Sequence, residues 1–227
     1  MRGSGTWRLD VVLFVASVVL FVGFPAVDLW FSGLFFDRSE GRFVWDQRGP
    51  SGDVVRAFDE VHLWVIGATL LGIASSLAVR APYRPQLRRS SAFLLAVLLL
   101  GPGLVVNGVL KEYVGRARPD QIAAFGGEQR FTRAFQITDQ CETNCAFTSG
   151  HASIGFYFIS LVWVFRRPPS VLPGVVLGCG LGMLRIGQGR HYLSDVVFSF
   201  WVVYATALVC APILGPAATP RAGEAPD

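Results

Sequence analysis

Two of the three histidines in this sequence lie in short polar clusters between long apolar runs, where they could take part in chemistry. His191 precedes Asp195 by four residues, a spacing that puts both side chains on one face of a helix. The carboxylate can then hold one ring nitrogen and fix the tautomer, which leaves the other nitrogen free to attack phosphorus. Together with His151, this predicts an acid and a nucleophile, or an acid and a base.

Cationic side chains accompany both histidines. Lys111 is the only lysine in the chain, and it follows an apolar run directly. By itself it could be an interfacial residue whose ammonium group reaches towards water. Together with Arg116, Arg118 and Arg185 it could instead surround a phosphate group, because arginine supplies bidentate contacts.

The cluster that contains His151 also contains a candidate anion site. Ser149 and Gly150 come immediately before a predicted helix. Backbone N–H groups at a helix N-terminus bind anions, and glycine allows a ligand to approach closely. Ser149 could equally be an ordinary helix cap, and both interpretations use the same geometry.

The elements that carry these clusters are strongly apolar. Of the 227 residues, 52% are hydrophobic and only 16% are charged, whereas soluble domains have about a quarter charged residues. Segments near 20 residues long can span a membrane as helices. We therefore predict an all-α bundle of six transmembrane helices in one domain over residues 1–215, followed by a disordered cytoplasmic tail over 216–227. The six apolar segments are Val11–Val27, Leu63–Val79, Ser91–Leu110, Ala152–Phe165, Val171–Leu184 and Val196–Leu214.

The arginines outside the clusters predict the orientation of the bundle. Arginines lie before the first segment, between the second and third, and between the fourth and fifth, and the positive-inside rule places these positions in the cytoplasm. The loop from Asp28 to Glu60 carries more acidic residues than arginines, as an external loop may. Both termini are then cytoplasmic, and all three polar clusters lie at the extracytoplasmic ends of helices 3 to 6. The basic residues occupy connectors between apolar runs, so we expect membrane lipids as partners and no nucleic acid.

The residues alone do not decide whether the chain binds a metal ion or forms a disulfide. The His191–Asp195 pair could hold a metal ion, but its surroundings lack the further ligands of a hydrolytic metal centre. Cys141 and Cys145 lie in the long external loop, where they could form a disulfide or, with no second ligand pair to support it, a zinc site. The other two cysteines lie in apolar segments and are expected to be small core residues.

The three clusters, in this order, resemble the signature of the type 2 phosphatidic acid phosphatase family, which is K-x6-RP, PSGH and SR-x5-H-x3-D. Every charged or imidazole position is present at the required spacing, although Thr148 stands in place of proline and Leu184 in place of serine. In this chain the three parts are Lys111 to Arg118-Pro119, Thr148-Ser149-Gly150-His151, and Leu184-Arg185 to His191 and Asp195.

The resemblance implies a reaction without metal or other cofactor. His191 would attack phosphorus to form a phosphohistidine, and Asp195 would orient it. His151 would protonate the leaving oxygen and then activate water. The charged phosphate oxygens would be stabilised by Lys111, Arg118, Arg185 and the amides of Ser149 and Gly150.

The resemblance implies a lipid phosphate monoester or pyrophosphate as substrate, at the periplasmic face of a bacterial inner membrane. The segment Asp28–Asp37 and the stretch from Cys141 to Cys145 look similar to bacterial members near the lipid A phosphatases. Phosphatidylglycerophosphate, phosphatidate and undecaprenyl pyrophosphate stay open as substrates. A lipid phosphotransferase is one alternative. A non-catalytic transporter is another, although the ionisable residues gather at helix ends and not within the spans.

Overall fold

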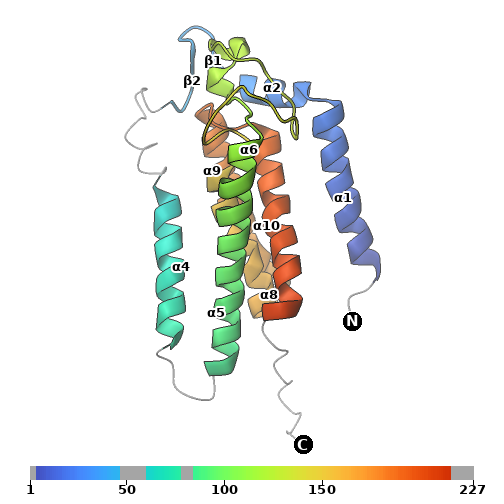
Figure 1. The fold of residues 1–227 in the computed structure, drawn as a ribbon, viewed down its shortest axis with the longest axis vertical. Helices are drawn as coiled ribbons and strands as arrows, with labels where there is room; N and C mark the ends of the chain where they lie inside the picture. Colours follow the sequence, from blue (N-terminus) through green and yellow to red (C-terminus); the bar gives the residue numbers. More distant parts are fainter. Residues whose placement is uncertain (1–3, 47–59, 78–83, 216–227) are drawn as a thin grey trace, which may run out of the picture.

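The computed structural model describes residues 4–46, 60–77 and 84–215, and these are mostly helical (Figure 1). Helices occupy most of the described part of each predicted apolar segment, so the prediction of a mainly helical chain is confirmed. The predicted tail over 216–227 lies outside the described residues. In chain order the main helical units are α1 (Ser4–Gly23), α2 (Ala26–Gly33), α4 (Val61–Leu77), α5 (Arg84–Leu98) with η2 (Leu99–Leu110) and α6 (Lys111–Tyr113), α7 (Gly150–Phe156) with η5 (Tyr157–Ser160) and α8 (Leu161–Phe165), η6 (Pro168–Val171) with α9 (Leu172–Gly187), and α10 (Leu193–Leu214).

Three helical stretches in the described part of the chain are long and apolar enough to cross a membrane: Pro85–Tyr113, Pro168–Gly187 and Leu193–Leu214. A fourth is added if α1 and α2, which meet at an angle of 83°, are counted as one span. The apolar helices Ile66–Ser75 and Gly150–Phe165 are shorter. The chain therefore has three or four helices of membrane-spanning length among these residues.

The first apolar segment ends earlier than predicted. The sequence predicts one run over Val11–Val27, but α1 stops at Gly23 and α2 starts after Pro25. Proline cannot donate a backbone hydrogen bond, and it disfavours helical geometry in the residue before it, so the helix breaks here. As a result α2 lies across the upper end of the bundle, near α6 (Figure 1).

A small hairpin is the main departure from an all-α fold. Strands β1 (Phe36–Asp37) and β2 (Arg42–Phe43) pair antiparallel, with Phe36 opposite Phe43. The hairpin lies at the same end of the bundle as α2 and α6, whereas α8, the start of α1 and the end of α10 lie at the opposite end (Figure 1). The polar loop after α6 also lies at the upper end and includes two short turns, η3 (Pro119–Gln121) and η4 (Ala123–Phe125).

The long helix that leads to Lys111 changes its hydrogen-bond pattern in the middle. Residues Leu99–Leu110 form a π-helix that contains Pro102. Proline removes one backbone donor, and a wider turn is a common way for a helix to absorb such a break. The side chain of Asn107 donates to the Pro102 carbonyl at 2.7 Å, which stabilises the irregular turn just before the polar end of the helix.

Close packing of α7 against α9 relies on glycine. A Cβ atom on Gly155 would lie 2.5 Å from the backbone nitrogen of Gly178, so the two helices could not pack as closely if alanine replaced Gly155. Cys210 is buried in the core as expected, but Cys179 is exposed on α9, and the prediction that it packs in the core is wrong. The tight α7–α9 contact brings the start of α7 and the end of α9 to the same end of the bundle.

Candidate active site

Residues from all three polar clusters line one cavity of about 240 Å³. This volume holds a group several times larger than a water molecule, which occupies about 30 Å³ in the liquid. Three cations and one histidine therefore face a common space at the ends of the helices. The cavity is lined by Lys111, Arg118, Arg185, Gly150 and His151 from the predicted site, together with Ile66, Asn107, Asn144 and Ile154.

His191 is almost completely buried, and its Nδ1 atom is held by the protein backbone. Nδ1 lies 2.8 Å from the carbonyl oxygen of Ala146 and 3.5 Å from Oδ2 of Asp195. A carbonyl oxygen can only accept, so this contact favours the tautomer with the proton on Nδ1. The spacing argument assigned that contact to Asp195, whereas the shorter contact comes from Ala146. The lone pair available for attack is then on Nε2.

The surroundings of His191 favour its neutral, nucleophilic form. Burial lowers the pKa of the imidazole well below its usual value near 6.5. Positive charge nearby lowers the pKa further, and it comes from Lys111, Arg185 and Arg118. The ring is therefore uncharged at neutral pH, as a nucleophile must be.

Asp195 belongs to a buried network centred on Arg116. Nη1 of Arg116 donates to Asp195 Oδ1 at 2.6 Å, and Nη2 donates to Asp28 Oδ2 at 2.8 Å. Ser194 links Asp28 to the guanidinium, because its hydroxyl group donates to Asp28 at 2.6 Å and accepts from Arg116 at 2.8 Å. The second oxygen of Asp195 accepts from the Tyr192 amide at 2.8 Å. Both oxygens of the residue beside His191 are thus fixed.

Arg116 does not line the cavity, although the sequence suggested that it could surround a phosphate group. Its side chain is 0% exposed, its guanidinium lies 4.0 Å from the centroid of the Tyr192 ring, and Nε donates to the Thr132 carbonyl at 2.9 Å. Arg190 is also absent from the lining and instead forms a half-buried ion pair with Asp120 at 3.1 Å. Of the five cationic residues in the clusters, four arginines and one lysine, only Lys111, Arg118 and Arg185 line the cavity.

Asp28 is a residue of this region that spacing could not reveal. It lies 88 positions before Arg116 and is 0% exposed, with Oδ1 accepting from the Ser194 amide at 2.9 Å. Charged residues are rarely fully buried unless they are paired, and Asp28 follows this rule. One signal did exist in the sequence, since Asp28 begins the segment that resembles the lipid A phosphatases.

Ser149 starts α7 as a helix cap. Its hydroxyl oxygen accepts from the Ala152 amide at 3.4 Å, and its own amide donates to the Asp195 carbonyl at 3.3 Å. The Ser149 amide is therefore already hydrogen-bonded to the third motif and is less available to bind an anion. Gly150 does line the cavity, and a Cβ atom there would lie 2.8 Å from Oδ1 of Asn107 and 3.4 Å from Nζ of Lys111.

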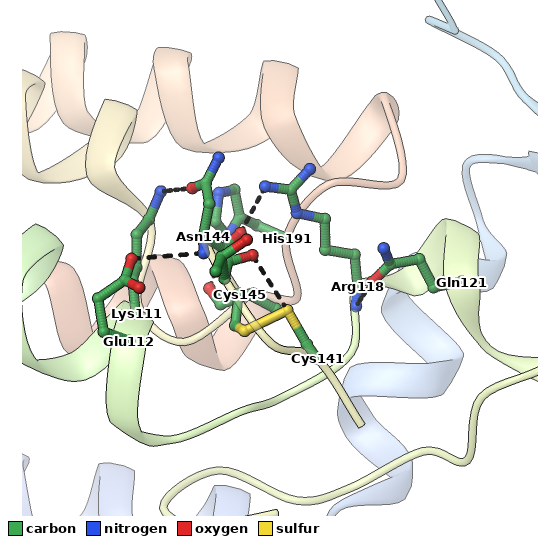
Figure 2. Close-up of a disulfide and its surroundings, with 10 residues drawn as sticks. Lys111, Glu112, Arg118, Gln121, Cys141, Asn144, Cys145 and His191 are labelled. Carbon is green, nitrogen blue, oxygen red and sulfur yellow. Dashed lines mark hydrogen bonds between the residues drawn. A yellow bond between two sulfur atoms is a disulfide. The ribbon is translucent and has the colours of Figure 1, made fainter. Parts of the chain in front are cut away.

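Cys141 and Cys145 form a disulfide, which decides between the two interpretations of this pair. Asn144, inside the disulfide loop, accepts a hydrogen bond from Lys111 through its side chain and from Arg118 through its carbonyl. Figure 2 shows these two cations reaching Asn144 from opposite sides. Sequence reasoning missed Asn144, because an asparagine in a polar loop carries no signal of its own.

The described residues offer no group of three or more His, Cys, Asp or Glu side chains that could hold a metal ion. What the cavity does offer is a set of hydrogen-bond donors and positive charges beside the His151 imidazole. His191 is not part of the lining, but the cations Lys111, Arg185 and Arg118 are close enough to lower its pKa. Such a set can bind an oxyanion and stabilise the charge that develops on it during transfer.

Comparisons with known proteins agree with this chemistry. The chain matches the PAP2 superfamily over residues 91–217. It is 34% identical over 211 residues to the lipid A 4'-phosphatase of Francisella tularensis subsp. novicida (strain U112), covering 87% of this chain and 93% of the relative. It is 32% identical over 215 residues to the lipid A 4'-phosphatase of Rhizobium leguminosarum, covering 85% and 91%.

A third relative carries a related name. The lipid A 1-phosphatase of Rhizobium johnstonii (strain DSM 114642 / LMG 32736 / 3841) is 30% identical over 220 residues, covering 85% of this chain and 80% of the relative. No solved structure matches the chain at a significant level.

Proposed function

This chain belongs to the PAP2 superfamily, as its three motifs predict, and we propose that it is an integral membrane phosphatase that hydrolyses a phosphate monoester of a lipid of the lipid A class. The observation that carries this proposal is the single cavity in which Lys111, Arg118 and Arg185 meet His151. Three cations beside His151, with His191 held by the Ala146 carbonyl and close enough to the same cations for them to lower its pKa, suit phosphoryl transfer through a covalent intermediate.

In the first step, Nε2 of His191 attacks phosphorus and forms an N–P bond, while the bond from phosphorus to the lipid oxygen breaks. His151, which lines the cavity with the three cations, gives its proton to the leaving oxygen. The hydrogen bond from Nδ1 to the Ala146 carbonyl supports this direction of attack, since it keeps the lone pair on Nε2. The Asp195 carboxylate nearby stabilises the positive charge that develops on the ring.

In the second step, His151 takes a proton from water, and the water oxygen attacks phosphorus as the N–P bond breaks. Inorganic phosphate leaves, and both histidines return to their starting forms. Throughout, the cations hold the equatorial oxygens, and removing one such donor typically lowers the rate about 10²–10³-fold. The chain's own residues perform each of these roles, so the mechanism uses no metal ion.

Within the lipid A class we propose the 4'-phosphate as the substrate position. Two relatives named for that position are 34% and 32% identical over 87% and 85% of this chain. Two relatives named for the 1-position are 30% identical over 85% of the chain and 33% identical over only 48% of it. The two named activities act on the same lipid, so a substrate with phosphate at both positions tests the choice directly.

We further propose six membrane spans with both termini in the cytoplasm and the cavity facing the periplasm of the inner membrane. Supporting this, each of the six apolar segments contains a helix within its described residues, including the shorter helices Ile66–Ser75 and Gly150–Phe165. The arginines at 166–167 follow α8, at the end of the bundle opposite α6 (Figure 1). The Cys141–Cys145 disulfide is also in keeping with an oxidising compartment.

The test is an assay of the purified full chain in detergent with lipid A that carries phosphate at both positions. Free phosphate should be released in the presence of EDTA, and mass spectrometry should locate the loss at the 4' position. His191→Ala should lower the rate at least about 10³-fold. His62→Ala, which changes the one histidine outside the three clusters, should keep the wild-type rate.

Each alternative gives a different result in the same assay. A phosphotransferase would move the phosphate to an added acceptor lipid and release little of it. A transporter would release none. Wild-type turnover in the His191→Ala variant would show that the nucleophile is assigned wrongly.

A further inference from the structure

We propose that Asn144, presented by the Cys141–Cys145 disulfide, is a positioning residue that holds two of the phosphate-binding cations in place, so that opening the disulfide weakens phosphate binding. The inference rests on the proposed function, because it assumes that Lys111 and Arg118 bind the phosphate group. It concerns a loop that lies outside the three motifs, and it assigns a purpose to the disulfide.

The contacts of Asn144 bind it to both cations at once (Figure 2). Nζ of Lys111 donates to Oδ1 of Asn144 at 2.9 Å, and Nη2 of Arg118 donates to the Asn144 carbonyl at 2.6 Å. The Asn144 amide donates to Oε1 of Glu112, the neighbour of Lys111, at 3.4 Å. The side-chain oxygen, the backbone carbonyl and the backbone N–H of this one residue therefore all contact the two chain segments that supply the cations.

These contacts leave both cations able to bind an anion. A lysine ammonium has three N–H donors and an arginine guanidinium has five, and Asn144 engages one from each. Arg118 also has its Nε buried with no hydrogen-bond partner within the described residues. Lys111, Arg118 and Asn144 line the same cavity, so the remaining donors can converge on a phosphate group there.

The neutrality of Asn144 explains why an amide suits this position. Lys111 and Arg118 lie in a cavity with Arg185, and three like charges at close range repel each other. Long cationic side chains also lose considerable entropy when they are held in one conformation. An amide oxygen and a backbone carbonyl can hold the cations without cancelling their charge, whereas a carboxylate would neutralise them and compete with the phosphate.

The disulfide is what keeps Asn144 in place. Asn144 has φ of 50°, a left-handed conformation that asparagine adopts more readily than most residues. The bond between Cys141 and Cys145 closes a short ring around it and limits the other conformations that this loop could take. Within the ring, the Cys145 amide donates to the Lys111 carbonyl at 3.2 Å, which ties the ring to the helix end.

Reduction of the disulfide should therefore release Asn144 from the cations. With dithiothreitol as the reductant, each cysteine sulfur gains one electron and one proton. The dithiol supplies both electrons and both protons and is itself oxidised to a cyclic disulfide. The Cys141 and Cys145 thiols that result no longer constrain the loop between them.

The experiment uses the full chain in detergent and measures kcat, KM for lipid A and the inhibition constant of inorganic phosphate. Asn144→Ala should raise KM and the inhibition constant roughly tenfold, as expected when a hydrogen bond to a charged group is lost. Asn144→Asp should raise the inhibition constant further, because its carboxylate repels phosphate. The matched control is Glu142→Ala, which changes an exposed side chain in the same ring and should leave all three constants unchanged.

The disulfide is tested by dithiothreitol and by the double variant Cys141→Ser, Cys145→Ser. Both should raise the inhibition constant of phosphate to about the level of Asn144→Ala, and dithiothreitol should have no further effect on the double variant. Thermal unfolding without phosphate shows whether each protein is folded. The rise in unfolding temperature on adding inorganic phosphate measures binding without any turnover.

Three outcomes would overturn the inference. If Asn144→Ala and the double variant keep phosphate inhibition constants within twofold of an active wild type, the positioning role is wrong and the proposed function stands. If only Asn144→Ala is impaired, the role of the disulfide is wrong. If phosphate does not raise the unfolding temperature of the wild type, the cavity is no phosphate site. A wild type that binds phosphate but releases none from lipid would contradict the proposed function alone.

Discussion

Replacing Arg116 with methionine should destabilise the fold while sparing phosphate binding. Methionine keeps much of the side-chain volume, so the change removes the charge and the hydrogen bonds and creates little cavity. Arg116 compensates two fully buried carboxylates, Asp28 and Asp195, at 2.8 and 2.6 Å. Without it, both carboxylates stay buried near each other with no opposing charge.

The size of the effect follows from the contacts. Removing one partner of a buried ion pair costs about 3–5 kcal/mol in unfolding free energy. For a chain of this length, 1 kcal/mol corresponds to about 2–4 °C in unfolding temperature, so the decrease should be roughly 6–20 °C. Adding Asp28→Asn removes one of the two uncompensated charges, and it should restore at least about 1 kcal/mol to the Arg116→Met variant.

The assay is thermal unfolding in detergent, followed by tryptophan fluorescence, for the two single variants and the double variant. Arg133→Met serves as the control, because Arg133 is exposed in the loop after α6 and should tolerate the same chemical change. The inhibition constant of inorganic phosphate should stay near that of the wild type. An Arg116→Met protein that unfolds at the wild-type temperature but binds phosphate at least tenfold more weakly would refute the reasoning and make Arg116 a substrate contact.

Four further predictions concern the cavity and its support. Gly150→Ala should lower kcat/KM by up to about 100-fold, because its Cβ atom would displace the neighbouring side chains, whereas Gly180→Ala, which meets nothing within 4 Å, should not. Ser194→Ala should lower the unfolding free energy by about 1–3 kcal/mol, measured by thermal unfolding, since it leaves buried carboxylate and guanidinium groups unsatisfied. The lowered pKa of His191 keeps it neutral below pH 6.5, so the pH–rate profile should show no loss from this group near that pH. Arg185→Gln removes a positive charge that lowers the His191 pKa, so this pKa should rise. The acid limb of the pH–rate profile should then move to higher pH, whether or not the maximal rate also falls.

Local features of the sequence were sufficient to predict the helices and most of the cavity. Long apolar runs with few charges predict helices wherever they occur, because the backbone must satisfy its own hydrogen bonds in an apolar medium. The motif spacings then place Lys111, Gly150 and His151 at helix ends, where a common cavity is the natural result. The sequence contains the proline that breaks the first helix, Pro25. Because Phe24 and Ala26 on either side are apolar, the segment was nevertheless predicted as one continuous run.

Contacts between distant segments could not be predicted in this way. The carbonyl that holds His191 belongs to Ala146, 45 positions away, and the carboxylate that completes the Arg116 network belongs to Asp28, 88 positions away. Ala146 lies in a polar loop with no hydrophobic period to indicate its path, and the place of Asp28 depends on how α2 packs against distant helices.

The sequence by itself determined the class of the protein, its helical segments and the charged residues that are candidates for the chemistry, because residue type and motif spacing are local properties. Only the tertiary structure decided which cations face the cavity and which are buried scaffold. Arg116 and Arg118 stand two positions apart, yet one is enclosed by two carboxylates and the other reaches Asn144. The difference arises because each guanidinium binds the carboxylate or carbonyl group that tertiary folding places beside it. Those acceptors come from segments that are distant in the sequence, so the local sequence does not identify them.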